Sequence, residues 1–406
     1  MRHIVVIGCG FAGYHAARRL EEGLAGRRRV QLTVVTRRAH FVFSPLLSSV
    51  ASAELEPEDV TISVDNAFRP RTRVVIDHVD RIDFEDRKLY CEHQTIAFDY
   101  LLIATGGVRD NTTMEGAGGL LGPDTLTDAV TIRDRIEKIV AAEEYPIRFA
   151  IIGASTTGVE WAAELATSLA LDKGLSCHQE KLEIDLYEAG PRLLPDHSAA
   201  LSDLATRALD EQGIGLHTGH KVLSAEPTGL ILEDTSRVDA SLVFHCGGRV
   251  GIPLWEGEQL TLDDRNRIVV DQKLRAQGVT GVFVAGDAAS RRDDLPKSSN
   301  PQIARQQGEQ AARNLLADMT GRSKRNFQFE DRGDFVTLGR NNAILEVRGL
   351  ILEGKAAWLA YRLFYTALMP RPFQKTRMLM DWVGQRMGLP TDEINENGDE
   401  EDSSSP

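Results

Sequence analysis

Three glycines close to the N-terminus, Gly8, Gly10 and Gly13, have the G-x-G-x-x-G spacing that binds the diphosphate of a dinucleotide. The apolar run from Ile4 to Ile7 predicts a strand buried in a parallel sheet, and Tyr14 to Leu20 predicts a helix. In such a turn one glycine permits the bend, one lets the backbone approach the diphosphate, and one lets the helix pack on the strand. The helix N-terminus then offers free N–H groups to the phosphates. The segment therefore predicts a dinucleotide site.

A second turn of this kind lies near the middle of the chain at Gly153, Ser155 and Gly158, with serine in the place of the middle glycine. Ile147 to Ile152 predicts the strand before it, and we expect a helix from Val159 to about Ala170. The chain therefore carries two candidate dinucleotide sites.

An acidic residue at the end of the following strand usually binds the ribose hydroxyls of the dinucleotide. Glu188 has this position in the second unit, after a strand expected from Leu182 to Tyr187. Because a carboxylate repels a 2′-phosphate, the second site should prefer NADH to NADPH. In the first unit the position falls to Thr36, followed by Arg37. A threonine hydroxyl bonds ribose more weakly than a carboxylate does.

Other apolar segments predict the elements that position these residues. Tyr100 to Ala104 is expected to form a buried strand that ends in the small-residue turn Thr105-Gly106. A strand from Val279 to Val284 is followed by Asp287, where a carboxylate would face a ligand. The apolar loop from Phe41 to Leu47 is compatible either with core packing or with a loop that covers a cofactor. Arg73 to Ile76 and Lys88 to Tyr90 are expected to be strands of a meander.

Bulk properties exclude several classes of protein. The 406 residues suffice for two or three domains, and the formal charge of -13 argues against nucleic acid as a partner. The four cysteines have no C-x-x-C spacing, so they predict neither a disulfide framework nor a metal site and suit a reducing cytoplasm. We expect no signal peptide, because Met1 leads directly into the first strand. No apolar run approaches the roughly 20 residues needed to span a bilayer.

The C-terminal part differs from the rest of the chain. Lys355 to Met369 is apolar nearly all round and contains aromatic residues, and eight basic residues surround it against three acidic ones. These basic residues are Arg340, Arg348, Lys355, Arg362, Arg371, Lys375, Arg377 and Arg386. Lys355 to Met387 is therefore expected to dock on an anionic membrane surface rather than span the bilayer. The alternative is burial against the body of the protein or in a homodimer.

Several motifs follow one another along the chain, namely GCGFAG, HFVFSPLL, LLIATGG, GASTTGVEWAAELA, LYEAGPRLLP, GVFVAGDAA, PQIARQQGEQAARNL and LGRNNAI. Together with the basic, tryptophan-bearing C-terminal segment, they resemble the flavoproteins with two dinucleotide-binding domains. Within this group the chain looks like the type II NADH:quinone oxidoreductases, and the resemblance runs from Arg2 to about Met387.

The resemblance implies FAD at the first turn and NADH, as a substrate, at the second. NADH then gives hydride to FAD, and the electrons pass to a membrane quinone without proton pumping. Glu160 matches a carboxylate near the junction of nicotinamide, flavin and quinone, and Gln302 and Gln306 match glutamines of the quinone pocket. The implied cofactor-binding residues are Gly8, Gly10, Phe11, Ala12, Gly13, Thr36, Arg37, Pro45, Ala104, Thr105, Gly106, Asp287, Gly153, Ser155, Gly158, Glu188 and Gly247.

Three positions depart from the pattern of these enzymes. Thr36 replaces the usual acid, Pro301 stands where the glutamine motif usually begins with alanine, and His245 replaces a common tryptophan. The first bears on the strength of FAD binding and the second on the quinone site.

We therefore predict an α/β protein with two Rossmann-like domains, the NAD domain being inserted in the FAD domain, and a mainly helical, membrane-associating C-terminal segment. The expected limits are 1–115 and 263–330 for the FAD domain, 116–262 for the NADH domain, 331–390 for the C-terminal segment, and 391–406 for a disordered acidic tail. The expected location is peripheral, on the cytoplasmic face of the cell membrane. Two alternatives remain: a ferredoxin- or rubredoxin-type reductase that uses NAD(P)H, and a flavin- and NAD-binding redox sensor with little turnover.

Overall fold

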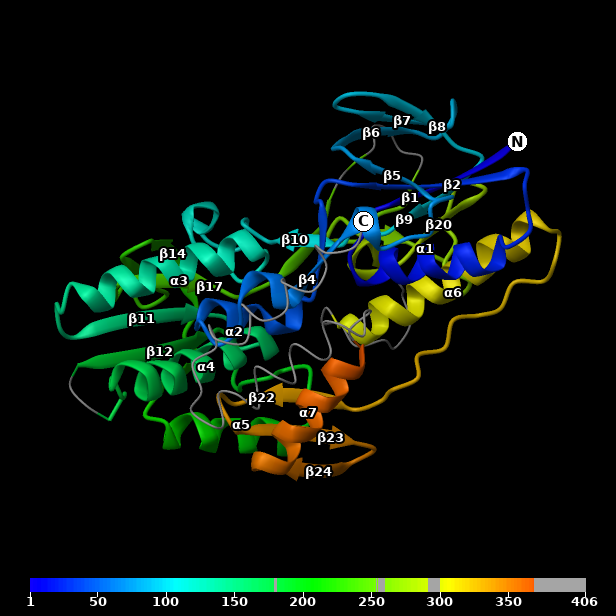
Figure 1. The fold of residues 1–406 in the computed structure, drawn as a ribbon. Helices are drawn as coiled ribbons and strands as arrows, with labels where there is room; N and C mark the ends of the chain where they lie inside the picture. Colours follow the sequence, from blue (N-terminus) through cyan, green and yellow to red (C-terminus); the bar gives the residue numbers. More distant parts are fainter. Residues whose placement is uncertain (179–180, 253, 255–259, 291–299, 369–406) are drawn as a thin grey trace, which may run out of the picture.

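The computed structural model describes residues 1–178, 181–252, 254, 260–290 and 300–368 (Figure 1). The described chain contains two parallel sheets, each accompanied by helices. The predicted α/β fold with two Rossmann-like units is therefore confirmed. The expected acidic tail and the C-terminal segment after Leu368 lie outside the described residues.

The first sheet has five parallel strands in the order β20-β9-β1-β2-β5. They are β20 (Val282–Val284), β9 (Tyr100–Ile103), β1 (Arg2–Ile7), β2 (Val30–Thr36) and β5 (Arg73–Ile76). Ile4, Val5 and Val6 of the central strand are fully buried, as expected of a strand covered on both faces. Helices α1 (Phe11–Gly23) and α6 (Pro301–Met319) lie side by side along this sheet (Figure 1).

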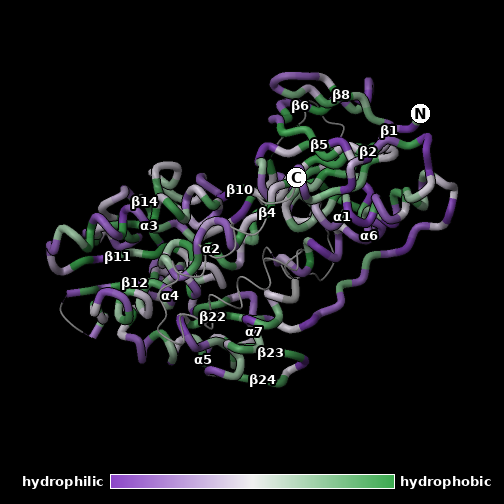
Figure 2. Tube along the Cα trace, viewed as in Figure 1, coloured by the Kyte–Doolittle hydropathy of each residue, from purple (hydrophilic) through white to green (hydrophobic). Residues whose placement is uncertain are grey.

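The second sheet has four parallel strands in the order β13-β12-β11-β17. They are β13 (Gly215–Thr218), β12 (Leu182–Glu188), β11 (Ile147–Ile152) and β17 (Leu242–His245). Its helices are α3 (Leu126–Ala141), α4 (Thr156–Lys173) and α5 (Ala199–Glu211). Figure 2 shows apolar strands in both sheets, and Phe149 and Phe244 are buried in the core of the second.

The chain crosses between the two sheets and returns. Two short strands, β10 (Gly107–Arg109) and β18 (Arg249–Gly251), pair antiparallel at the crossing. In the sequence, β20 of the first sheet follows all the strands of the second sheet. The second unit is therefore inserted in the first.

Two expectations about local structure need correction. Arg73–Ile76 is not part of a meander, because it pairs parallel with β2 at the edge of the first sheet. The meander instead consists of β6 (Val79–Asp83), β7 (Lys88–Cys91) and β8 (Thr95–Ala97). A short apolar strand does not reveal its pairing partner, and here the open edge of β2 accepts it. Helix α1 is also longer than the predicted segment, since it begins at Phe11 and ends at Gly23.

The C-terminal region forms an antiparallel sheet followed by a helix. The strands are β22 (Asp334–Thr337), β23 (Ala343–Val347) and β24 (Leu350–Glu353), and the helix is α7 (Gly354–Leu368). Ala357 and Tyr361 of α7 are buried, whereas Leu359 and Leu363 are exposed. The helix therefore packs with one face and leaves an apolar face open. Among the described helices, none combines the length and apolarity needed to cross a bilayer.

Arg362 does not have the role expected of a headgroup-binding residue. It is only 4% exposed and forms an ion pair with Glu54, which follows α2 (Leu47–Ala51). Helical periodicity places Arg362 on the packed face of α7 beside Tyr361, so its charge points inward. The remaining strands are β3 (His40–Val42), β4 (Thr61–Ser63), β14 (Val222–Glu226), β15 (Gly229–Leu232), β16 (Arg237–Asp239), β19 (Ile268–Val269) and β21 (Ala289–Ser290).

Candidate active site

One large cavity of about 950 Å³ joins the first glycine turn to α4, α6, β22 and α7. Its volume is at the upper end of the range for cofactor and ligand sites. Most of the predicted site residues line it: Gly8, Gly10, Phe11, Ala12, Thr36, Arg37, Pro45, Ala104, Thr105, Gly106, Glu160, Asp287, Gln302 and Gln306. The tertiary structure thus brings together residues predicted from separate motifs.

The N-terminus of α1 opens into this cavity. Gly10 is the N-cap residue of α1, so no side chain covers the first N–H groups of the helix. A Cβ at Gly10 would meet open space. Gly8 has a φ of +92°, which favours glycine, and Gly13 packs against the Gly8 carbonyl so closely that no side chain fits. The free N–H groups and the open space beside them fit the diphosphate of FAD.

The ribose end of this site contains Thr36, Arg37 and Arg38. The Thr36 hydroxyl is engaged by its own turn, since it accepts a hydrogen bond from the Arg38 backbone N–H at 3.4 Å and donates to the Arg38 carbonyl at 3.3 Å. Burial lowers the pKa of the Arg38 guanidinium. Two guanidinium groups, those of Arg37 and Arg38, therefore lie beside Thr36, and the carboxylates of Asp124 and Asp128 act on Arg38.

Asp287 belongs to a charged network at the crossing between the two sheets. Arg249 lies 3.3 Å from the Asp287 carboxylate and 2.8 Å from that of Asp124, and Arg109 lies 3.5 Å from Asp124. Asp287 and all three partners line the cavity. Asp287 thus lines the cavity, and Arg249 partly neutralises its charge.

Glu160 lies near the start of α4, where it lines the cavity opposite the C-terminal sheet. Its Oε1 accepts a hydrogen bond of 3.0 Å from the Thr337 backbone N–H of β22. Burial raises the pKa of Glu160 to about 7, and the Thr337 hydrogen bonds oppose this shift. A carboxyl with such a pKa can hold or release a proton near neutral pH. The aromatic rings of Phe335, Phe364 and Tyr365 line the same end of the cavity.

The two predicted glutamines differ in their freedom. Gln302 donates from Nε2 to the Gly333 carbonyl at 2.7 Å, while its buried Oε1 has no hydrogen-bond partner in the part of the chain that is described. Gln306 instead exchanges two hydrogen bonds of 2.9 Å with the backbone of Glu330. Gln302 is therefore available to a ligand, whereas Gln306 fixes the loop before β22.

The second glycine turn lies outside the lining of the large cavity. Glu188 accepts hydrogen bonds from the backbone N–H groups of Ala154, at 2.8 Å, and Gly190, at 2.7 Å. Ser155 is the N-cap residue of α4, but its side chain accepts no hydrogen bond from the first backbone N–H groups of the helix. These N–H groups are therefore not capped by a side chain, as in α1. Gly158 packs on the Gly153 carbonyl, and Gly247 lies beside Gly153. These residues form one compact group, with Thr156, Thr157 and Glu160 of α4 leading from it into the cavity.

The apolar loop around Pro45 combines core packing with a place in the cavity wall. Phe41 and Phe43 are each 1% exposed and pack edge-on against Phe11, with ring centroids 5.3 Å apart in both pairs. Ser44 and Pro45 line the cavity. The loop is thus anchored in the core while its turn forms part of the cavity wall.

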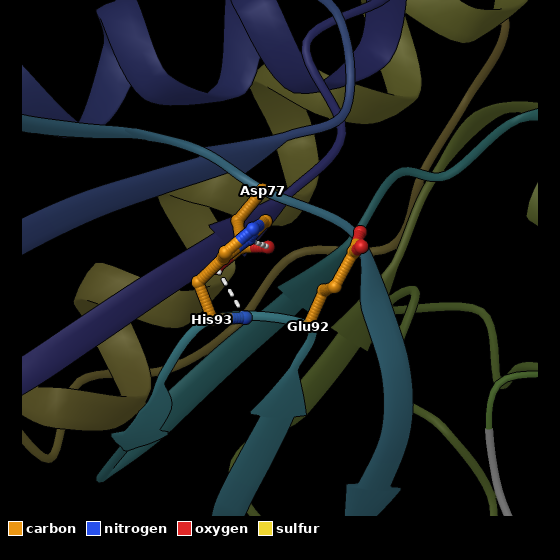
Figure 3. Close-up of side chains that lie close together, drawn as sticks. All are labelled: Asp77, Glu92 and His93. Atoms are coloured by element: carbon orange, nitrogen blue, oxygen red, sulfur yellow. Dashed lines mark hydrogen bonds and ion pairs between the residues drawn. The ribbon is translucent and has the colours of Figure 1, made fainter.

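A group of potential metal ligands lies at the end of β5, and one member, Asp77, also lines the cavity. Ligand atoms of Asp77, Glu92 and His93 lie within 4.8 Å of one another (Figure 3). The Asp77 carboxylate is already held by His93 Nδ1 at 3.1 Å and by the His78 backbone N–H at 2.8 Å. The His93 hydrogen bond lowers the pKa of Asp77, and Asp77 raises that of His93. The arrangement is an ion pair between the exposed His93 ring and the buried Asp77 carboxylate, and no sequence motif indicated it.

Several cavity residues were not predicted from the sequence. Arg249, His197 and Asp334 line the cavity, and burial raises the pKa of the Asp334 carboxyl. Arg249 follows the Gly247-Gly248 turn, which is the one signal that could have indicated it. His197 and Asp334 have no comparable motif.

Several known proteins are similar to this chain in sequence or in fold. The model of the family "Pyridine nucleotide-disulphide oxidoreductase" matches residues 2–311. Demethylphylloquinone reductase NdbB of Synechocystis is 28% identical over 402 residues, covering 95% of this chain and 96% of that protein. Type II NADH:quinone oxidoreductase of Staphylococcus aureus is 25% identical over 374 residues, covering 88% of this chain and 92% of that protein. The structure of NDH2 from Plasmodium falciparum in complex with NADH has a TM-score of 0.83 at 17% identity, covering 96% of this chain and 99% of that chain, and it shares the fold.

Proposed function

Since the chain belongs to the pyridine nucleotide-disulphide oxidoreductase family, we propose that it is a type II NADH:quinone oxidoreductase. The observation that carries the proposal is the single cavity that runs from the open N-terminus of α1 to Glu160 and Gln302. The two curated relatives described above support it, because each is named as a quinone reductase or NADH:quinone oxidoreductase.

The cysteines support quinone rather than a disulfide as the electron acceptor. All four lie in described residues and are free. Cys9 lines the cavity, but burial raises the pKa of its thiol to about 12. A thiol with this pKa is protonated at neutral pH and is a poor nucleophile.

FAD, when bound, accepts hydride from NADH and passes the electrons on to the quinone. The residues that would hold it are those around the first turn: the N–H groups of α1 at the diphosphate, Thr105 and Gly106 at the end of β9, and Asp287 toward the ribityl chain or phosphates. Thr36 and Arg37 would lie at the adenosine ribose. We propose residues 1–115 and 263–330 as the domain that carries this site.

NADH would bind at the second turn, within residues 116–262. The open N-terminus of α4 would bind its diphosphate, and Glu188 its ribose hydroxyls. Glu188 is held in place by two backbone N–H groups, so the carboxylate is fixed where a 2′-phosphate would otherwise lie. NADH is therefore the preferred nucleotide.

At the quinone end, Glu160 would hold a proton for a quinone oxygen, and Gln302 would bind the quinone or the hydroxyl of the quinol. Phe335, Phe364 and Tyr365 provide apolar walls that exclude water from the ring. Gln306 supports this site indirectly by holding the backbone of Glu330.

We further propose that β24 and α7, within the segment 331–390, dock on an anionic membrane surface. Leu350, Leu359 and Leu363 are 78%, 50% and 54% exposed, and Ile351 and Leu352 continue this apolar surface. Figure 2 shows the β23–β24 hairpin as hydrophobic. Docking would bring the cavity end that contains Tyr365 of α7 and Glu160 of α4 close to a quinone in the bilayer. We propose a peripheral position on the cytoplasmic face of the cell membrane, with a homodimer through the same surface as the competing arrangement.

The test is an anaerobic titration followed by turnover. Purified protein should show a flavin absorbance spectrum that NADH bleaches and a short-chain quinone restores. Glu160→Gln and Gln302→Ala should slow the restoration by roughly tenfold or more while FAD stays bound. Protein that retains flavin but gives no electrons to any quinone would instead support the ferredoxin-reductase or redox-sensor alternatives.

A further inference from the structure

A second buried carboxyl lies one helical turn beyond Glu160 on α4. Glu164 is 6% exposed, and its Oε1 accepts hydrogen bonds from the hydroxyls of Ser52, at 2.8 Å, and Ser168, at 3.0 Å. Residues four apart on a helix lie on the same face, with Cβ atoms about 6 Å apart. Glu164 does not line the large cavity, whereas its helical neighbour Glu160 does.

Charged groups from three other segments surround Glu164. Glu54 follows α2, Arg362 belongs to α7, and Arg340 lies in the turn between β22 and β23. Burial raises the pKa of Glu164 to about 7, the negative charge of Glu54 adds to the rise, and the Ser52 hydrogen bond, Arg340 and Arg362 oppose it. The negative charge of Glu164 in turn raises the pKa of Glu160.

Ser52 connects this group with the protein surface. Its side chain is half-buried, and the next residue, Ala53, is exposed. A chain of groups therefore leads from the partly exposed Ser52, through its hydrogen bond, to the buried Glu164 carboxyl, and Glu160 lies one helical turn from Glu164 at the cavity.

We propose that Glu164 is a positioning residue for proton delivery, which sets the protonation of Glu160 and passes protons to it from the Ser52 side. This inference rests on the proposed quinone reduction. The overall reaction is NADH + H⁺ + quinone → NAD⁺ + quinol, in which two electrons leave NADH and two protons arrive at the quinone oxygens. One of these protons must come from solvent in each turnover. Glu160 delivers a proton to the site, and Glu164 restores it.

The test compares Glu164→Gln with the parent enzyme in its flavin-containing form. Enzyme reduced with one equivalent of NADH is mixed anaerobically with a short-chain quinone between pH 5.5 and 9. In the parent, the rate should fall with rising pH around the pKa of Glu160, which is about 7. In the variant, the midpoint should move down by about one pH unit, because the neighbouring negative charge is gone. The rate at pH 7.5 should then fall roughly five- to tenfold, while reduction by NADH changes less than twofold.

A second readout needs no turnover. The infrared C=O band of protonated, buried carboxyls should titrate in two overlapping steps in the oxidised parent. Glu164→Gln should leave one step, at lower pH. If the variant fails to fold, Ser168→Ala serves instead: loss of this hydroxyl raises the pKa of Glu164, reduces its charge, and should move the Glu160 midpoint down by less than one unit.

Glu183→Gln is the matched control, because Glu183 is an exposed carboxylate on β12 paired with Arg148. An equal shift in this control, or an unchanged midpoint in Glu164→Gln, overturns the proposal and leaves Glu164 as a structural tie between α2 and α4. A parent enzyme that does not reduce quinone refutes the proposed function instead, and the infrared titration still decides whether the two carboxyls are coupled.

Discussion

At the scale of single residues, the two proposed dinucleotide sites both rely on backbone N–H groups at a helix N-terminus and differ in the residue proposed for their ribose end. Glu188 holds a carboxylate at the second site, whereas the hydroxyl of Thr36 at the first site is taken up by its own turn. The first site must therefore depend on diphosphate contacts and on packing around α1. The second gains charge selectivity as well.

Glu188→Gln should relax the discrimination against NADPH by about tenfold, which corresponds to ~1.4 kcal/mol. The uncharged amide no longer repels a 2′-phosphate, although it can accept only one of the two backbone hydrogen bonds. The measurement is kcat/KM for NADH and NADPH with a short-chain quinone. Glu183→Gln, on the same strand, should leave the ratio unchanged. A parent enzyme that uses both nucleotides equally well would contradict the assignment.

Gly13→Val should abolish flavin retention. A Cβ at this position collides with the carbonyl of Gly8, so α1 must move away from β1 and its N–H groups lose their place at the diphosphate. The readout is the flavin-to-protein absorbance ratio after purification, with circular dichroism to check folding. Gly119→Val is the control, because a Cβ there meets open space. A folded Gly13→Val protein with full flavin content would show that this packing is dispensable.

At the scale of elements, α7 has two unlike faces. Tyr361 donates a hydrogen bond to the Pro45 carbonyl at 3.3 Å, and Arg362 pairs with Glu54, so the inner face is tied to the loop around α2. The outer face presents Leu359 and Leu363. This division accounts for the apolar character of α7 nearly all round, because one face packs on the body and the other is exposed.

The double substitution Leu359→Glu and Leu363→Glu should weaken binding to anionic liposomes at least tenfold. Each change removes an exposed apolar side chain, worth about 1.5–3 kcal/mol when buried, and adds a charge that the lipids repel. Flotation at low salt measures the bound fraction. Leu171→Glu is a suitable control, since Leu171 is 64% exposed on α4. If the parent protein remains at the bottom of the gradient, this surface belongs to a homodimer or to another partner.

At the scale of the whole molecule, the cavity exists because three parts of the fold meet. The first sheet supplies the turn at α1, the second sheet supplies α4, and the C-terminal sheet and α7 close the far end. Glu160 and Glu164 lie where these parts join, and burial raises the pKa of both to about 7. The stability of the assembled fold should therefore depend on pH.

The sign of this dependence follows from proton binding. Each carboxyl has a higher pKa in the folded state than its ordinary value of 4.5, so the folded protein binds more protons between about pH 4.5 and 7. The free energy of unfolding should fall as pH rises through this range. Glu160→Gln removes one such group, so the variant should match the parent near pH 4.5 and exceed it at pH 8 by an amount on the order of 2 kcal/mol. Thermal unfolding from pH 4.5 to 8 measures the difference, and a difference independent of pH would refute it. Glu183→Gln should show no such trend.

The sequence by itself determined the features that depend on neighbours in the chain. Glycine spacing, the apolar strands before each turn and the helices after them predicted two Rossmann-like units, because a turn that binds a diphosphate is built within about a dozen residues. The residues at the ends of strands, such as Asp287 and Thr105, were found for the same reason. The carboxyl ends of parallel strands lie at the same edge of a sheet. In the structure, Thr105 and Asp287 accordingly line the same cavity.

Only the tertiary structure decided which distant residues meet. No local pattern indicates that Glu54 pairs with Arg362, that Ser52 bonds Glu164, or that Thr337 bonds Glu160. The charge of Arg362 suggested an outward, lipid-facing role, and the packing of α7 turned it inward. The pairing of β5 with β2, rather than within a meander, was likewise decided by an open sheet edge. Burial and charge pairing depend on three-dimensional packing, so the raised pKa values of Glu160 and Glu164, and with them the inferred route for protons, appear only once the chain is folded.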